Sequence, residues 1–189
     1  MKSRPTSSEP STPGTRRTRR LRRLMSLCAA TVVLGFLAAR YRLVWVVGDS
    51  MRPAYRPGNV LLVDRWAYSR QTPRRWDVVV ASHHGDWVVK RVVGLPGDRV
   101  GVRHGHVLLN GIRIQEPQIT EPGMLSIESG QLLGDRYAIL GDNRGIPEDS
   151  FVHAVVQRQQ LVGRVVSALR PLHGIRGMAA GVAGWFSTP

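Results

Sequence analysis

A serine and a lysine stand where they could form a catalytic pair. Ser50 follows a Val-rich segment and lies between Gly48 and Pro53, which break a strand, so we expect its hydroxyl on an exposed turn. Lys90 lies among aliphatic and aromatic residues in the segment 87–93, where strand alternation directs every second side chain inward. If Lys90 is buried beside Ser50, desolvation lowers the pKa of its amine, which can then accept the proton of the serine hydroxyl.

Each of these two residues also has an ordinary structural interpretation. A serine after Gly-Asp is common in turns, and a lysine in an edge strand can extend its ammonium group into solvent. For Lys90 to act as a base near neutral pH, its pKa must fall by roughly three units, or about 4 kcal/mol. A buried, valine-rich β environment can provide that shift, so the two residues together indicate a serine hydrolase of the Ser-Lys type.

The histidines offer a competing interpretation, a zinc site or a Ser-His-Asp triad. They cluster at the ends of expected hairpins, where exposed polar side chains are normal, and no acid stands at a spacing that would complete either site. The histidines concerned are His83, His84, His104 and His106. We therefore expect neither a metal ion nor a cofactor.

The part of the chain after residue 40 is expected to be mostly β. Its apolar residues come in short, Val-rich groups separated by Gly, Pro and Asp, a pattern typical of strands. The expected strands are Leu43 to Val47, Asn59 to Val63, Trp76 to Ala81, Trp87 to Val93, Asp98 to Arg103, His106 to Leu109, Ile112 to Gln115, Tyr137 to Leu140 and Leu161 to Val166.

Two hairpins are indicated by their turns. Asn110-Gly111 tolerates the positive φ of a two-residue turn and has apolar residues on both sides. His84-Gly85-Asp86 separates two Val-rich strands and predicts that the Lys90 strand pairs antiparallel with the strand before it. Between Gln115 and Gln131 the composition changes to Glu, Pro, Gly and Ser, which predicts a loop.

The N-terminal region combines a basic tail with an apolar run. Residues 1–23 contain eight Lys and Arg against one acid, within a net charge of +14 for the 189-residue chain, and we expect a disordered cytoplasmic tail. The uncharged run from Leu24 to Ala39 has 16 residues and is flanked by Arg40, which can extend its length by snorkelling. The charge distribution predicts a retained single-pass anchor over 24–40 with the N-terminus inside. A cleaved secretory signal fits the same features.

Three segments, taken together in this order and spacing, resemble type I signal peptidases. They extend over nearly the whole part that follows the apolar run. They are Gly48-Asp49-Ser50-Met51-Arg52-Pro53, the segment from Val89 to Asp98, and Gly141-Asp142-Asn143-Arg144 with Asp149-Ser150.

The resemblance implies a β-rich catalytic domain with an inserted hairpin region, preceded by one transmembrane helix. It places the catalytic domain at 43–170, with the insertion at about 99–135 and a C-terminal tail at 171–189. Ser50 would attack the scissile carbonyl, Lys90 would take its proton, and the backbone N–H of Ser50 would help to hold the oxyanion. Many family members have a second oxyanion donor, a serine, at the position of Gly48.

The family pattern also implies substrate-binding and supporting residues. The substrate would lie extended between the strand before Ser50 and the strand before Lys90, with small side chains in its pockets. The residues expected to line those pockets are Val46, Met51, Val88 and Val89, and plain core packing is an equally good interpretation of each. The supporting residues are Gly48, Arg91, Asp142, Asn143 and Asp149, among which Asp142 would pair with Arg91.

The sequence departs from the family pattern at two positions. A serine that often hydrogen-bonds the catalytic lysine is replaced by Pro147, and the arginine usual after Asp149-Ser150 is replaced by Phe151. Both departures concern the support of Lys90.

The sequence therefore predicts a membrane-bound serine endopeptidase that removes signal peptides from exported preproteins after Ala-x-Ala. Its expected partners are these preproteins and the lipid bilayer, and we expect no nucleic acid. Two alternatives remain. A self-cleaving Ser-Lys protease of the stress-response repressor type shares the Gly-Asp-Ser-Met motif but would need a DNA-binding helix-turn-helix before it. A non-enzymatic, membrane-tethered binding module would use the Arg-rich tail to bind lipid or nucleic acid.

Overall fold

The computed structural model describes residues 14–119, 122–145 and 153–169, with side chains from residue 19 onward. The chain divides into two compact units, residues 1–39 and 40–189, and each is described by itself. The regular secondary structure in the described part of the second unit is almost entirely β, as the sequence predicted.

The described part of the N-terminal unit is helical and belongs to α1 (Gly14–Arg40). Residues Arg19–Arg40 are long and apolar enough to cross a membrane, and this helix is compatible with membrane anchoring. The hydroxyls of Ser26 and Thr31 donate to the carbonyl oxygens of Arg22 and Leu27, so these polar side chains are satisfied within the helix.

The helix begins earlier than the sequence predicted. Residues 14–23 were assigned to a disordered tail, but they are helical. Arginine and leucine, which dominate residues 16–23, have high helix propensity, so the helix of the apolar run extends into the basic segment.

The second unit contains a seven-stranded antiparallel sheet with the order β1-β2-β11-β3-β4-β9-β10. Its strands are β1 (Tyr41–Trp45), β2 (Val60–Asp64), β3 (Val78–His83), β4 (Asp86–Gly94), β9 (Arg136–Leu140), β10 (His153–Gln157) and β11 (Leu161–Leu169). A short 3₁₀ helix, η1 (Arg158–Gln160), connects β10 to β11.

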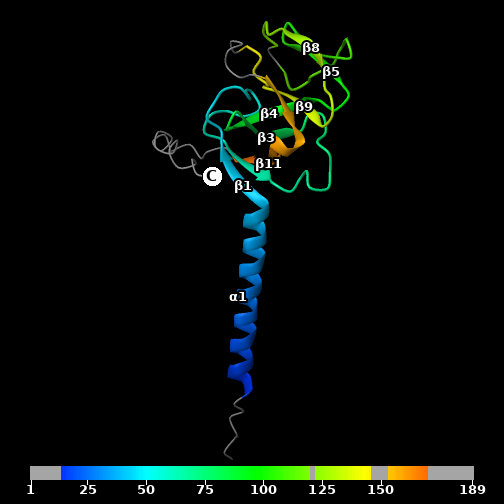
Figure 1. The fold of residues 1–189 in the computed structure, drawn as a ribbon. Coiled ribbons are helices and arrows are strands. Elements are labelled where there is room, and N and C mark those ends of the chain that lie inside the picture. Colours follow the sequence, from blue (N-terminus) through cyan, green and yellow to red (C-terminus); the bar gives the residue numbers. More distant parts are fainter. Residues whose placement is uncertain (1–13, 120–121, 146–152, 170–189) are drawn as a thin grey trace, which may run out of the picture. The chain divides into compact units, whose positions relative to one another are not determined.

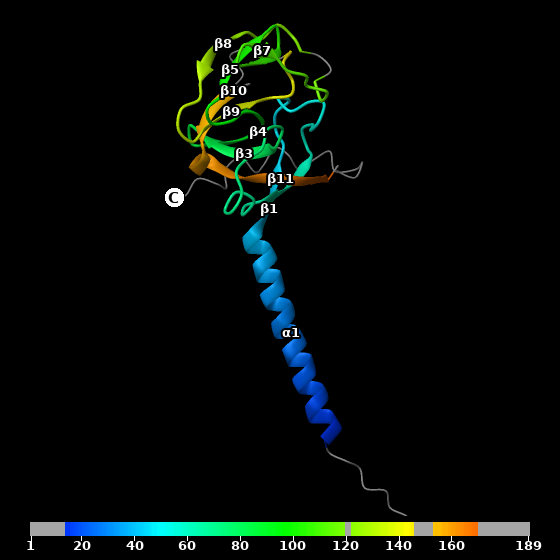
Figure 2. The same cartoon turned by 90° about the vertical axis from the view of Figure 1, so that its right-hand side faces the viewer.

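A second, four-stranded sheet has the order β7-β6-β5-β8. Its strands are β5 (Arg99–Arg103), β6 (His106–Leu109), β7 (Ile112–Arg113) and β8 (Ile127–Gln131). Figures 1 and 2 both show β5 and β8 at the end of the unit opposite β1 and β11, with β4 and β9 between them.

Three buried clusters hold the second unit together. One joins the two sheets through Val93, Val107 and Leu140, and a second packs Val79 against Ile139. The third, built around Val46, Leu61, Val63 and Val80, lies next to the segment that holds Ser50. Burial of these aliphatic side chains provides the main driving force for the fold.

Both predicted hairpins are present. Asn110 and Gly111 have φ values of 52° and 85°, as a two-residue turn with two left-handed positions requires. His84 and Gly85 make the same kind of turn between β3 and β4, with φ values of 52° and 89°. This second hairpin fixes the register of Lys90 opposite Val79.

Several strand predictions were wrong. β1 spans Tyr41–Trp45 instead of Leu43 to Val47, and β7 ends at Arg113 instead of Gln115. The loop predicted between Gln115 and Gln131 contains β8, which pairs with β5 through its backbone. The side chains of β8 are mainly polar and therefore lack the apolar pattern from which strands were predicted. β10 was not predicted, and β3 begins at Val78 rather than Trp76. Trp76 has φ 74°, outside the β region, so it ends the preceding turn instead of starting the strand.

Candidate active site

Ser50 lies on the turn that follows β1. Beyond β1 the chain still pairs with its neighbour, since Val46 N–H donates to Asn59 O over 2.9 Å. The turn itself is closed by Arg52 N–H donating to Asp49 O over 3.1 Å and by Tyr55 N–H donating to Met51 O over 2.8 Å. These bonds hold Ser50 at a fixed position at the end of the strand, as its Gly and Pro neighbours predicted.

Lys90 extends from β4 toward this turn. Its Nζ lies 2.6 Å from Ser50 Oγ, within hydrogen-bond distance, although 40 residues separate the two in the sequence. Lys90 is 5% exposed and is paired across the sheet with the fully buried Val79. The structure therefore brings together the two residues that the sequence singled out as a pair.

Burial changes the protonation of Lys90. Desolvation lowers the pKa of its amine from 10.5 to about 8, and the negative charge of Asp142 partly opposes this shift. A substantial fraction of the amine is therefore uncharged near pH 8. An uncharged amine at 2.6 Å from a hydroxyl can accept its proton.

Arg91 and Asp142 form a bidentate ion pair beside Lys90. Arg91 Nε donates to Asp142 Oδ1 over 2.8 Å, and Nη2 donates to Oδ2 over 2.6 Å. A third donor of Arg91, Nη1, reaches the carbonyl oxygen of Trp76 over 3.0 Å. The side chain of Asp142 is completely buried, so its charge requires this partner. The structure contains the pair that the resemblance implied.

Asn143 connects the Asp142 segment to the serine turn. Its backbone N–H donates to Ser50 O over 3.0 Å, and its side-chain Nδ2 donates to Asp49 O over 3.2 Å. These bonds fix two consecutive carbonyl groups of the turn. Asn143 therefore positions Ser50 from a segment more than 90 residues further along the chain.

The four residues expected to bind substrate lie near the pair but on different surfaces. Val46 and Val89 contribute to one buried cluster, whereas Val88 packs against the cluster that contains Val79. Met51 is 1% exposed. Consecutive residues of a strand point to opposite faces of the sheet, which explains why Val88 and Val89 separate.

Gly48 stands at the start of the turn with open space around it. A Cβ added to Gly48 would meet no atom within 4 Å. The position can therefore accept a side chain without steric conflict. The remaining supporting residue, Asp149, and the two departures at Pro147 and Phe151 lie outside the described residues.

A buried ion pair that was not predicted from the sequence involves Arg144, the residue after Asn143. Arg144 Nη2 donates to Glu116 Oε1 over 2.6 Å, and the two side chains are 0% and 2% exposed. Arg144 also donates to the carbonyl oxygens of Gly141 and Gly105, and Glu116 accepts from Val107 N–H. The pair thus connects the segment that holds Asp142 and Asn143 to the second sheet.

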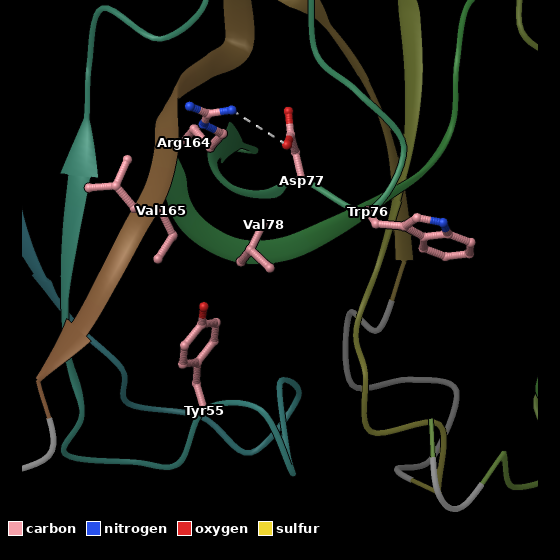
Figure 3. A pocket seen from close by; sticks show the side chains of 7 residues that line it. Tyr55, Trp76, Asp77, Val78, Arg164 and Val165 are labelled. Carbon is pink, nitrogen blue, oxygen red and sulfur yellow. Dashed lines mark ion pairs between the residues drawn. The ribbon is translucent and has the colours of Figure 1, made fainter. Parts of the chain in front are cut away.

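A cavity of about 390 Å³ lies close to the pair without including it. It is lined by Tyr55, Trp76, Asp77, Val78, Arg164, Val165 and Val166. Figure 3 shows the Tyr55 hydroxyl pointing toward Val78, with the Arg164–Asp77 ion pair on the opposite wall. Tyr55 also packs against the cluster of Val46.

Comparison with known proteins shows which family the chain is similar to. The model of the family described as signal peptidase, peptidase S26, matches residues 18–169. The chain is 30% identical over 182 residues to a signal peptidase I of Leptolyngbya laminosa, covering 90% of this chain and 88% of that one. It is 32% identical over 158 residues to a signal peptidase I of Bacillus caldolyticus, covering 75% and 84%.

Among solved structures, the chain is similar to the crystal structure of a signal peptidase I from Enterococcus faecalis V583. The sequences are 25% identical, the TM-score is 0.42, and the match covers 51% of this chain and 98% of that one. The family match extends over most of the chain and includes both members of the Ser50–Lys90 pair. The chain therefore belongs to the signal peptidase family, peptidase S26, and is a hydrolase of peptide bonds.

Proposed function

We propose that Ser50 and Lys90 are the nucleophile and the general base of this peptidase. Neutral Lys90 takes the hydroxyl proton while Ser50 Oγ forms a bond to the scissile carbonyl carbon. The same proton then passes to the leaving amine as the peptide C–N bond breaks, which leaves an acyl-serine. The free amine of Lys90 then takes a proton from water, whose oxygen forms a bond to the acyl carbon. The C–Oγ bond breaks, and the proton passes from Lys90 to Ser50 Oγ, which restores both residues. The observation that supports this proposal is the 2.6 Å distance between Nζ and Oγ in a buried setting.

The strand edges beside the pair suit an extended substrate. β1 is an edge strand of the larger sheet. On β4, only Arg91 to Gly94 pair with β9 in the described part of the chain, so Asp86 to Lys90 have a sheet partner on one side, β3. Ser50 and Lys90 stand where these two edges meet. We propose that the residues before the cut add as a strand between them, with backbone hydrogen bonds on either side.

The residues beside this path support a preference for small side chains. Val46 and Met51 are already buried, and Val89 is packed against Val46's cluster, so the aliphatic walls leave little room for large groups. Alternate side chains of an extended peptide point to the same face, which supports selection at the first and third positions before the cut. We propose cleavage after Ala-x-Ala, with Val46, Met51, Val88 and Val89 as the contact residues. Val88 points to the face opposite Val89 and would therefore meet the residue between the two alanines.

Three further residues support the pair in this proposal. Asn143 fixes the carbonyl groups of Asp49 and Ser50 and thereby orients the Ser50 N–H as an oxyanion donor. The Arg91–Asp142 ion pair neutralises a buried charge next to Lys90, which keeps the amine from facing an unpaired anion or cation. Gly48 supplies no side-chain donor, and Asp149 is assigned a supporting role by the family pattern alone.

The helical segment Arg19–Arg40 places the enzyme at a membrane in this proposal. Six Arg residues between 16 and 23 favour a cytoplasmic N-terminus, which would put the catalytic unit on the outer side. Exported preproteins enter the same bilayer through their signal segments. Confinement of enzyme and substrate to one plane raises their effective concentration, so weak intrinsic affinity is sufficient.

The direct test uses the full chain in detergent with a preprotein whose signal ends in Ala-x-Ala. We expect a single cut after the second alanine, and a loss of at least 10³-fold in rate for Ser50→Ala and for Lys90→Met. Mass spectrometry of the products identifies the bond. Equal cleavage by all three proteins would remove the Ser50–Lys90 mechanism, and cleavage of the enzyme itself instead of the preprotein would favour the self-cleaving alternative.

A further inference from the structure

Arg42 and Trp87 form a contact that the proposed mechanism does not use. The guanidinium carbon of Arg42 lies 4.8 Å from the centroid of the Trp87 ring, which is a cation–π contact. Arg42 belongs to β1 and Trp87 to β4, although β2, β11 and β3 stand between these strands in the sheet order. The contact therefore joins β1 directly to β4, the two strands whose free edges are proposed to bind the substrate.

The position of this contact along the strands can be measured from Lys90. Trp87 precedes Lys90 by three residues, which is roughly 10 Å along an extended strand. Lys90, further along β4, meets Ser50 on the turn that follows β1. Counted along β4, an extended peptide whose first residue before the cut lies at Lys90 would have its fourth residue before the cut beside Trp87, which Arg42 contacts.

The two side chains are free to interact with a ligand. Both are exposed, Trp87 at 46%. Arg42 forms no salt bridge with any residue that the structure describes. Stacking on an indole orients a guanidinium group but leaves its in-plane N–H donors available. The contact thus presents an oriented, uncompensated positive charge above the path of the substrate.

We propose that Arg42 and Trp87 form a specificity site for the fourth residue before the cut, which accepts acidic or neutral side chains and disfavours lysine and arginine. This inference rests on the proposed function, because it places the scissile bond at Ser50. Arg42 acts by charge and by donating to carboxylate or carbonyl oxygens. Trp87 acts by holding the guanidinium group in place.

The test compares peptides that differ only at this residue. The full chain in detergent is given Ala-x-Ala peptides with Glu, Gln or Lys at the fourth position before the cut, and kcat/KM is measured for each. We expect the Glu peptide to exceed the Lys peptide by roughly tenfold at low salt, with a smaller ratio at high salt. Arg42→Gln should bring the ratio close to one, and Arg42→Glu should reverse it.

Two further variants control this experiment. Trp87→Ala should reduce the ratio because Arg42 loses the ring that orients it, whereas Trp87→Phe should keep most of it. Arg113→Gln removes another exposed arginine, on β7 of the second sheet. This variant should have the same activity and the same Glu-to-Lys ratio as the enzyme without a substitution. A purely structural role of Arg42 would change all three peptides equally and leave the ratio intact.

Two results would overturn the inference. One is an enzyme without substitutions that cleaves the Glu and Lys peptides equally well, and the other is an Arg42→Glu variant that still prefers the Glu peptide. The outcome is separate from that of the proposed function. A peptide that begins at the third residue before the cut cannot reach Arg42, and its cleavage, lost in Ser50→Ala, tests the Ser50–Lys90 pair alone.

Discussion

At the scale of single residues, the chemistry depends on one buried amine. Lys90 is surrounded by strands rather than by water, and desolvation alone accounts for the fall of its pKa to about 8. Asp142 acts in the opposite direction, but its charge is already shared with Arg91 through two hydrogen bonds. The ion pair therefore limits how far Asp142 can restore the pKa of Lys90.

The pH dependence of activity follows from this value. Only the uncharged amine can take the proton of Ser50, so kcat/KM should rise about tenfold per pH unit below pH 8 and level off above it. The activity falls with falling pH because protonation of Lys90 removes the base. Initial rates on a neutral peptide between pH 5 and 10 measure the profile. A profile that is flat from pH 6 to 9 would contradict a Lys90 base.

Gly48 offers a gain of function. A serine at this position would meet no atom within 4 Å of its Cβ, and its hydroxyl would stand two residues before the nucleophile, where many family members have an oxyanion donor. We expect Gly48→Ser to raise kcat at least several-fold, since single oxyanion donors have large effects. Gly48→Ala is the matched control and should not raise kcat. A serine variant no faster than the alanine variant would show that the hydroxyl does not reach the oxyanion.

At the scale of secondary-structure elements, the second sheet is connected to the active site by the Glu116–Arg144 pair. Both side chains are almost completely buried, so removal of one partner leaves an uncompensated charge. Glu116→Ala should lower the free energy of unfolding by about 3 to 5 kcal/mol. Guanidinium denaturation of the full chain in detergent measures this loss.

The control for this prediction is an exposed acid. Glu128 on β8 is exposed, and Glu128→Ala should change the free energy of unfolding by less than about 0.5 kcal/mol. If Glu116→Ala is as mild as the Glu128 variant, the Arg144 charge must be satisfied by its carbonyl contacts alone.

The sequence predicted those elements whose local pattern agrees with their final environment. The two tight hairpins were found because their Asn-Gly and His-Gly turns lie between apolar strands. β8 was missed because its residues, Ile127–Gln131, are mainly polar and its pairing with β5 is visible only in three dimensions. The boundary at Trp76 depends on a left-handed residue that no turn motif indicates.

The same distinction applies to the site. Ser50 and Lys90 were suggested by their neighbours and connected by the resemblance to a family, and the pairing of Arg91 with Asp142 came from the resemblance alone. Glu116 and Arg144 are 28 residues apart and belong to segments without regular periodicity. Arg42 and Trp87 look like exposed strand residues until the strands are placed. Contacts of this kind have no local signal in the sequence.

At the scale of the whole molecule, the N-terminal helix is compatible with membrane anchoring. The segment Arg19–Arg40 can serve as a retained anchor or as a cleaved signal. We propose that it is retained, and intact-mass measurement of the membrane-bound protein should give about 21.0 kDa. A mass that lacks residues 1–39 would show that the segment is removed.

The proposed mechanism requires the amine of Lys90 to be uncharged within the working pH range. NMR titration of the full chain in detergent, with lysine labelled at its side chain and Lys90→Met used to assign the signal, measures this pKa directly. We predict a pKa of about 8 for Lys90, equal within error to the midpoint of the pH–activity profile. A Lys90 pKa near the ordinary 10.5 would contradict the account, because the amine would then be charged whenever the enzyme acts.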